Sequence, residues 1–131
     1  MKRLQVSTAR REQFVDITSA VAAAVAEAGA ADGWALAYCP HTTAGITINE
    51  NADPDVVRDL LAALERMVPR EAGYSHREGN ADAHVKASLM GSSATVPVTG
   101  AALALGRWQG IYLCEFDGPR TRNVFVDVRA C

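Results

Sequence analysis

The sequence predicts one α+β domain, with a largely antiparallel β-sheet or sandwich and two or three helices packed against it. Its 131 residues suit a single domain, and 49% of them are hydrophobic, which is enough for a core without disulfide bonds. Short apolar runs with the period of strands are mixed with segments of helical periodicity, and neither a repeat nor a linker is visible. We therefore expect one domain over residues 1–131.

The first part of the chain is expected to form strands around one helix. Three short segments have the composition of strands: residues 4–9, 34–39 and 44–49. The helix between the first two is capped by Asp16 or Thr18 and is ended by Gly29 or Gly33. Because Pro40 ends the second strand, His41 should lie in a turn between two strands.

A second helix is expected after the third strand. Asn51-Ala52-Asp53-Pro54 has the pattern of a helix start, with Asp53 at the N-cap and Pro54 in the first turn. Apolar residues then recur at helical spacing: Val57, Leu60, Leu61, Leu64 and Met67. The pattern ends at Pro69, so we expect a helix buried along one side.

Residues 82–90 fit two kinds of structure. Their polar and apolar residues alternate as in a strand, but the alanine, lysine, leucine and methionine content and the following Gly91 suit a helix with a C-terminal stop. We favour the helix. On a helix two polar pairs would share a face: Asp82 with Lys86, and His84 with Ser88.

The last part of the chain contains four segments with strand composition: residues 95–99, 103–109, 111–116 and 123–129. Asp117-Gly118-Pro119 separates the last two and is typical of a tight turn. We therefore expect these two strands to form a β-hairpin.

Composition argues against several classes of function. The formal net charge is −2 and lysine and arginine are scattered, so nucleic-acid binding is not expected. The longest apolar run, residues 20–31, is too short to span a bilayer, and the N-terminus has charges where a signal peptide needs its hydrophobic segment. We expect a cytoplasmic protein without a membrane partner. Cys39, Cys114 and Cys131 form no CxxC pair, and the first two should lie in the core.

All three histidines lie among polar residues, and His76 falls in a polar, glycine-containing loop expected over residues 70–80. Three neutral imidazoles with one open position are a familiar shell for catalytic zinc, so we expect His41, His76 and His84 to bind a divalent metal, zinc before magnesium. Their spacing matches neither HExxH nor a zinc finger. The alternative, that each histidine is a hydrogen-bonding surface residue, stays open.

Other polar residues could complete such a site. Glu50, Glu78 and Asp82 could join the metal shell, orient the imidazoles or act as general bases, or they could be solvated carboxylates or helix caps. A phosphate could be received by ammonium, hydroxyl and guanidinium donors: Lys86, Ser92, Ser93 and Arg120. By itself, the Gly-Ser-Ser segment is also typical of an ordinary loop.

Three segments together resemble the YjbQ-like family over nearly the whole chain. They are His41-Thr42-Thr43-Ala44-Gly45-Ile46-Thr47-Ile48-Asn49-Glu50, Glu78-Gly79-Asn80-Ala81-Asp82-Ala83-His84-Val85-Lys86-Ala87-Ser88-Leu89-Met90-Gly91-Ser92-Ser93, and Gly106-Arg107-Trp108-Gln109-Gly110 through Glu115-Phe116-Asp117-Gly118-Pro119-Arg120. The resemblance implies a small α+β protein that assembles as a homotrimer, with its histidine segments in a pocket near the subunit interface. It also implies a secondary thiamine-phosphate synthase.

That reaction would join hydroxymethylpyrimidine diphosphate to thiazole phosphate and release diphosphate, as a side activity. Negative charge grows on the leaving diphosphate, so cationic donors or a divalent ion must stabilise it. The residues expected to act in catalysis are His84, Glu78, Asp82 and Lys86. Magnesium would suit the diphosphate substrate if the ion is not zinc.

Two alternatives from other classes fit the same residues. One is a trimeric protein that binds a metal or a small phosphate compound without efficient turnover. The other is a metal-dependent hydrolase of phosphate or ester bonds, in which the metal would generate hydroxide. Product formation with water as the only nucleophile would distinguish the hydrolase from the synthase.

Overall fold

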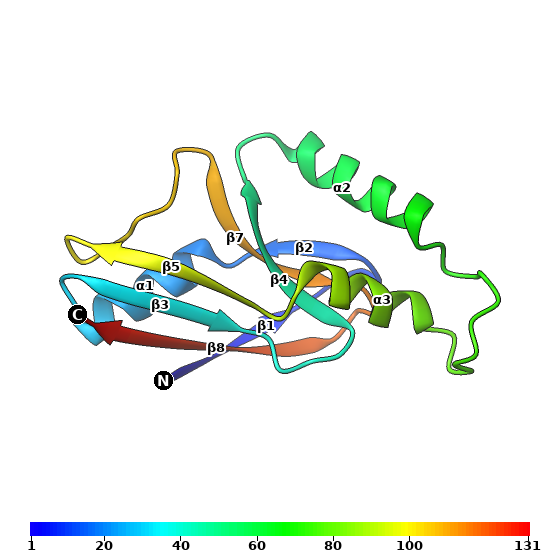
Figure 1. The fold of residues 1–131 in the computed structure, drawn as a ribbon, viewed down its shortest axis with the longest axis horizontal. Helices are drawn as coiled ribbons and strands as arrows, with labels where there is room; N and C mark the ends of the chain where they lie inside the picture. The colour runs from blue at the N-terminus through cyan, green and yellow to red at the C-terminus, as the bar shows by residue number, and fades with distance from the viewer.

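Two antiparallel sheets organise the fold in the computed structural model, which describes all 131 residues (Figure 1). The strands are β1 Lys2–Ser7, β2 Gln13–Asp16, β3 Gly33–Tyr38, β4 Ala44–Glu50, β5 Ser93–Thr99, β6 Ala102–Leu103, β7 Gln109–Glu115 and β8 Thr121–Ala130. The helices are α1 Thr18–Ala28, α2 Pro54–Met67 and α3 Ala81–Met90. The five-stranded sheet has the order β1-β8-β3-β5-β6, and the three-stranded sheet has the order β2-β7-β4.

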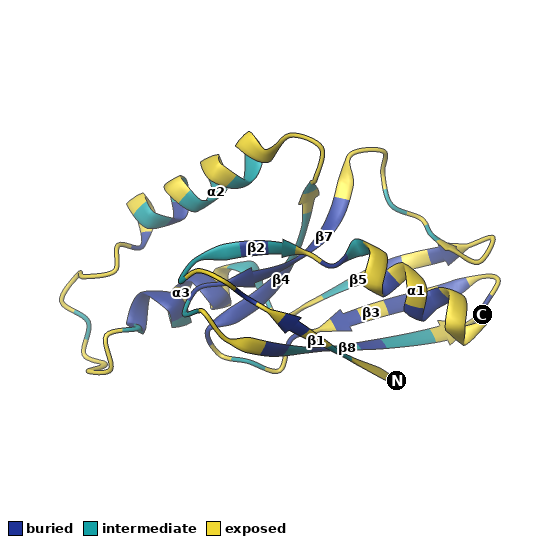
Figure 2. Ribbon diagram, turned by 180° about the vertical axis from the view of Figure 1, so that it is seen from behind, coloured by how far each residue is buried: buried dark blue, intermediate teal, exposed yellow.

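The three-stranded sheet forms the middle layer of the molecule. One of its faces shares a core with the five-stranded sheet, where Ile46 and Leu113 join Val124 of β8. Its other face packs under α2 and α3, where Phe116 shares a cluster with Leu64. Helix α1 covers part of the inner face of the five-stranded sheet, as the view from behind in Figure 2 shows. This α+β arrangement of stacked sheets confirms the predicted fold class.

A glycine ends α1 and an aspartate caps α2 as expected, but the expected cap of α1 is wrong. Ile17 is the N-cap residue of α1 and no side chain caps the helix; Asp16, one residue earlier, accepts a hydrogen bond from the Thr18 backbone N–H at 2.9 Å. Gly29 ends α1 in a left-handed conformation with φ of 71°. At the start of α2, Asp53 accepts from the Asp55 backbone N–H at 2.9 Å, with Pro54 in the first turn. Residues 82–90 are helical, which confirms the favoured of the two alternatives.

The predicted hairpin of the last two strands is wrong. β7 lies in the three-stranded sheet between β2 and β4, whereas β8 lies in the five-stranded sheet between β1 and β3. Both edges of each strand are therefore already paired. The turn at Asp117-Gly118-Pro119 carries the chain from one sheet to the other instead of joining neighbouring strands.

Two smaller expectations were also wrong, and one strand was not expected. Residues 103–109 are not one strand: Leu103 ends β6, Gln109 begins β7, and a turn lies before Gln109, whose backbone N–H donates to the Gly106 carbonyl at 3.0 Å. β2 was not predicted, because its four residues give too short a pattern. Met67 ends the apolar stripe of α2 but is 66% exposed, because it lies in the last turn of the helix.

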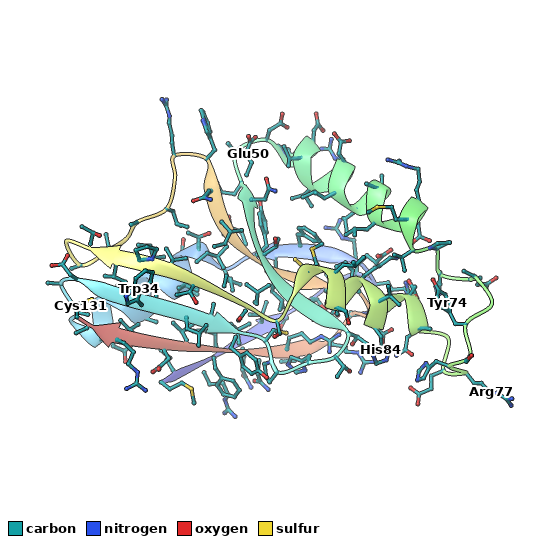
Figure 3. The ribbon with its side chains drawn as sticks, viewed as in Figure 1. Trp34, Glu50, Tyr74, Arg77, His84 and Cys131 are labelled. Carbon is teal, nitrogen blue, oxygen red and sulfur yellow. The ribbon has the colours of Figure 1, made fainter.

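The outer face of the five-stranded sheet carries large apolar side chains. Along β3, buried and exposed residues alternate, and the exposed set contains Trp34, Leu36 and Tyr38 (Figure 3 labels Trp34). β3 is the central strand of this sheet. The apolar side chains therefore lie in the middle of an open face. None of the three helices is long and apolar enough to cross a membrane.

Candidate functional site

A pocket of about 470 Å³ lies between the turn after β3 and helix α3. We call it the imidazole pocket, and its lining residues are His41, Thr42, Ala44, His84, Ala87, Ser88, Gly91 and Ser92. Figure 3 shows His84 on α3 beside the turn that joins β3 to β4. Two imidazoles and three hydroxyl side chains thus face one space, and none of the lining residues is a carboxylate.

The packing of α3 on β4 gives this pocket its shape. A Cβ added at Gly45 would lie 2.6 Å from the Gly91 carbonyl oxygen, so only glycine allows this close approach. The Ile46 backbone N–H donates to the same carbonyl at 3.0 Å. The spacing predicted for a helix also holds, because His84 and Ser88 both line the pocket, and the Ser88 hydroxyl donates to the His84 backbone carbonyl at 2.9 Å.

His41 is held by the main chain of β8. The Asn123 backbone N–H donates to Nε2 of His41 at 2.9 Å. Burial lowers the pKa of His41, and the positive charge of Arg122 lowers it further. The imidazole is therefore neutral near pH 7.

A buried ion pair lies directly behind this turn. Arg122 Nε donates to Glu115 at 2.9 Å, and the Arg122 guanidinium donates to the Thr43 hydroxyl at 2.8 Å. Burial alone would raise the pKa of Glu115, but hydrogen bonds from Arg122, the Asp117 backbone and the Thr8 hydroxyl outweigh it and hold that pKa below its ordinary value. Glu115 stays ionised, and the pair fixes the turn that carries His41.

His76 approaches His84 from the loop that precedes α3. Their ring centroids are 5.2 Å apart in an edge-to-face arrangement. Both rings also line a second hollow of about 320 Å³, together with Tyr74, Ser75 and Ala81. His84 therefore lies between the imidazole pocket and this hollow.

The three histidines do not form one metal-binding group within the chain. No set of three histidine, cysteine, aspartate or glutamate side chains converges closely enough to hold an ion. His76 and His84 are neighbours, whereas His41 directs Nε2 to the main chain of β8. The residues of one chain therefore do not fit the three-histidine zinc site expected from the sequence.

Lys86 does not face the imidazole pocket. Its side chain is completely buried, and its ammonium donates to Glu12 at 3.0 Å, to Glu65 at 2.7 Å and to Asp82 at 3.1 Å. An ammonium has three N–H donors, and all three are used. The expected phosphate-binding and catalytic roles of Lys86 therefore have no support in the geometry.

Asp82 belongs to the same buried group. Besides Lys86, its carboxylate accepts two hydrogen bonds from the Arg11 guanidinium, at 3.3 and 3.0 Å. Burial would raise the pKa of Asp82, but these donors lower it below its ordinary value. A carboxylate that is ionised, paired and enclosed is a poor general base for a ligand in the pocket.

Of the remaining expected site residues, only Ser92 lines the imidazole pocket. Ser92 lines the imidazole pocket, whereas its neighbour Ser93 begins β5 and does not line it. Glu78 is exposed in the loop before α3. The Arg120 guanidinium donates to the Asp117 carboxylate at 3.0 Å, outside the pocket lining but close enough to His41 to disfavour its protonation.

Glu50 also lies away from the imidazole pocket, at the far end of β4 (Figure 3). Its carboxylate accepts a hydrogen bond from the Asp53 backbone N–H at 3.2 Å, and its backbone carbonyl accepts one from the Tyr112 hydroxyl at 3.1 Å. Through these contacts Glu50 stabilises the connection between β4 and α2.

Sequence reasoning missed three groups that matter to the pocket. Thr42 lies within the histidine motif, so its position next to His41 was a usable signal. Arg122 and Glu115 gave no local signal, because they reach the turn from β8 and from the end of β7.

Comparisons with known proteins identify relatives over almost the full length. Residues 2–130 match the family model described as UPF0047 protein YjbQ-like. The chain is 53% identical over 127 residues to the UPF0047 protein YugU of Bacillus subtilis, with 96% of each chain covered. It is 48% identical over 126 residues to a UPF0047 protein of Methanocaldococcus jannaschii, covering 96% of this chain and 91% of the relative.

Solved structures agree with these sequence matches. A YjbQ/UPF0047 family protein from Clostridium acetobutylicum superimposes with a TM-score of 0.97 at 54% identity, covering 98% of this chain and all of that one, 100%. A protein of unknown function from Sulfolobus solfataricus superimposes with a TM-score of 0.95 at 33% identity, covering 99% and 96% of the two chains. The names of these relatives give a family and no activity.

Proposed function

Because the chain belongs to the YjbQ-like UPF0047 family, we propose that its imidazole pocket binds a small phosphorylated substrate and supports a thiamine-phosphate synthase reaction as a side activity. The observation that carries the proposal is the composition of the pocket. Its lining provides imidazole and hydroxyl groups and no carboxylate, in a chain whose formal net charge is −2. A region free of acidic side chains on an acidic protein favours an anion.

The pocket groups suit a leaving diphosphate. In the proposed reaction the thiazole nitrogen forms a bond to the pyrimidine methylene carbon, and the bond from that carbon to the diphosphate oxygen breaks. The electron pair of the broken bond leaves with diphosphate, so negative charge rises there and no proton has to leave the thiazole. Hydrogen-bond donors fixed before the reaction stabilise such charge most effectively.

Three side chains of the pocket can donate hydrogen bonds to the leaving diphosphate. His84 lies on α3 and Ser92 follows the end of that helix, and Thr42 lines the same pocket from the turn after β3. The hydroxyls of Thr42 and Ser92 make no hydrogen bond within the chain, so they remain available to phosphate oxygens. His84 contributes an imidazole whose ring is likewise free. No step of this proposal uses a metal ion.

A synthase assay tests the proposal. Purified protein is supplied with hydroxymethylpyrimidine diphosphate and thiazole phosphate, and thiamine phosphate and diphosphate are measured, before and after treatment with a chelator. We expect the two products in equal amounts, and we expect His84→Ala to lower the rate at least tenfold through loss of a charge-stabilising donor. Equal rates for the parent protein and His84→Ala would contradict the proposed role of the pocket.

The same assay distinguishes the alternatives. Release of phosphate from a panel of phosphoesters, with water as the only nucleophile, would indicate a hydrolase instead of a synthase. Saturable binding of both substrates without any product would indicate a binding protein. A parent protein that neither binds nor converts these compounds would overturn the proposal as a whole.

A further inference from the structure

The tautomer of His41 is set by the way β8 continues beyond its partner strand. The paired register of β3 and β8 ends at Tyr38 and Phe125. Asn123 lies two residues before Phe125, where β3 no longer supplies an acceptor, and its backbone N–H donates to His41 Nε2 at 2.9 Å. The imidazole nitrogen therefore takes the place that a strand carbonyl would occupy, and it satisfies a main-chain donor.

This hydrogen bond decides which atom His41 can offer to a ligand. A neutral imidazole has one nitrogen with a lone pair and one N–H. Since Nε2 uses its lone pair to accept from Asn123, the hydrogen lies on Nδ1. A protonated ring is disfavoured by the same contact, because Nε2–H would then face another N–H donor.

From this geometry we propose that His41 acts on the pocket ligand as a fixed Nδ1–H hydrogen-bond donor and is not a metal ligand. Metal binding needs a nitrogen lone pair, and the only lone pair of the neutral ring is already used. The inference rests on the proposed function in one respect: it takes the pocket ligand to be an anion whose oxygens accept this hydrogen bond.

The surroundings of His41 keep the donor in place. The Thr43 carbonyl accepts from the Phe116 backbone N–H at 3.1 Å, and the Thr43 hydroxyl accepts from buried Arg122 at 2.8 Å. The turn is thus tied to β7 and β8 on the side away from the pocket. Burial and the Arg122 charge also lower the pKa of His41, which favours the neutral ring. The donor is held before the ligand arrives, so little ordering is needed on binding.

His84 provides a contrast inside the same pocket. Ser88 donates to its backbone carbonyl, and the His84 ring itself makes no hydrogen bond within the chain. Either nitrogen of His84 is therefore open to a ligand, whereas His41 can offer only its N–H. The two imidazoles are not equivalent.

Nuclear magnetic resonance of histidine-labelled protein tests the tautomer directly. Long-range proton–nitrogen correlation spectra identify which ring nitrogen carries the hydrogen, and His41→Asn assigns the signal. We expect the Nδ1–H form at pH 7, unchanged when zinc ions are added. An Nε2–H or doubly protonated ring, or a His41 signal that zinc converts to the pattern of a metal ligand, would overturn the inference.

Two substitutions separate the roles of the two nitrogens. Asparagine places an amide N–H near the position of Nδ1 but leaves the Asn123 N–H without its acceptor, whereas glutamine can reach Asn123 but has no donor at the Nδ1 position. With inorganic phosphate as the probe, we expect His41→Gln to bind roughly tenfold more weakly than the parent protein, and we expect His41→Asn, which keeps a donor near the position of Nδ1, to bind more tightly than His41→Gln. Thermal melting should show the reverse order, with His41→Gln close to the parent protein.

The results also separate this inference from the proposed function. A parent protein that does not bind phosphate would contradict the proposed anion pocket and with it the donor role, whatever the tautomer. If the parent protein binds phosphate and His41→Gln binds equally well, the pocket stands and the donor role of His41 is wrong.

Discussion

The Lys86 ammonium is enclosed by three carboxylates, which determines what its removal would do. Its partners are Glu12, Glu65 and Asp82, at 3.0, 2.7 and 3.1 Å. Asp82 is itself completely buried. When Lys86 is removed, the buried Asp82 carboxylate loses a partner where water cannot replace it, which is costly.

We predict that Lys86→Met acts on stability and not on ligand binding. The substitution should lower the free energy of unfolding by about 3 kcal/mol, because Asp82 loses a buried partner. For a chain of this size, that corresponds to a melting temperature lower by about 10 °C. Calorimetry measures the shift, and phosphate titration below the melting temperature gives the affinity. A Lys86→Met protein with parent-like melting but greatly weakened phosphate binding would contradict this account.

The position of Lys86 was beyond prediction from sequence for a definite reason. A lysine in Ala-Asp-Ala-His-Val-Lys has the composition of a solvated helix face, and only the contact with Asp82 is local. The other two partners lie 21 and 74 residues away along the chain. By contrast, His41, His84 and Ser92 were predicted as site residues from polar groups in local motifs, and the structure places them together.

At the level of elements, the imidazole pocket depends on how closely α3 approaches β4. Gly45 lies where the end of α3 crosses the strand, and an added Cβ would meet the Gly91 carbonyl oxygen at 2.6 Å and the Met90 Cβ at 3.1 Å. Both contacts are too short to be accommodated without movement, and one of them is with the main chain. The end of α3 would have to shift, and Gly91 and Ser92 of the pocket with it.

We predict that Gly45→Ala disturbs both stability and the pocket. Overpacking of this kind costs roughly 1–3 kcal/mol, and the displaced segment should weaken phosphate binding as well. Gly106→Ala is a suitable control, since a Cβ there would meet mainly the flexible Gln109 side chain, at 3.2 Å. Denaturant unfolding and phosphate titration of both variants test the expectation. Equal behaviour of the two variants would show that the close approach at Gly45 is not needed.

Helix ends could be predicted from nearby residues, whereas strand pairing could not. The Gly29 stop of α1 and the Asp53 cap of α2 were predicted because each lies within a few residues of the helix end that it determines. Which strands pair with one another depends on residues that lie far apart in the sequence. Asp117-Gly118-Pro119 has the composition of a hairpin turn, yet β7 and β8 are paired on both edges by other strands, so the chain changes sheet there.

The whole molecule exposes more surface than a chain of its mass usually does. Its accessible area is 7227 Å², whereas a monomeric protein of 13.9 kDa is expected to expose about 6,700 Å². Part of this surface is the open face of the five-stranded sheet, with Trp34, Leu36 and Tyr38 on its central strand. Contiguous apolar surface of this kind is typical of an interaction site.

We predict that the protein is a homotrimer and that this sheet face contributes to the contact. Light scattering should give about three times the chain mass, and Trp34→Ser should shift the protein toward smaller species because it removes apolar contact area. Met67→Ser is the control, as Met67 is also exposed but lies at the end of α2 and not on the five-stranded sheet. A protein that is monomeric at all concentrations, or a trimer unaffected by Trp34→Ser, would contradict the respective part of this prediction.

The central claim is that the imidazole pocket binds the phosphate groups of a small substrate, and adjacent serines offer the most direct test of it. Ser92 lines the pocket, and Ser93 does not. Titration calorimetry with inorganic diphosphate should show saturable binding to the parent protein, about tenfold weaker binding to Ser92→Ala through loss of a hydrogen bond to a charged ligand, and unchanged binding to Ser93→Ala. No saturable binding to the parent protein, or equal losses in the two variants, would contradict the claim.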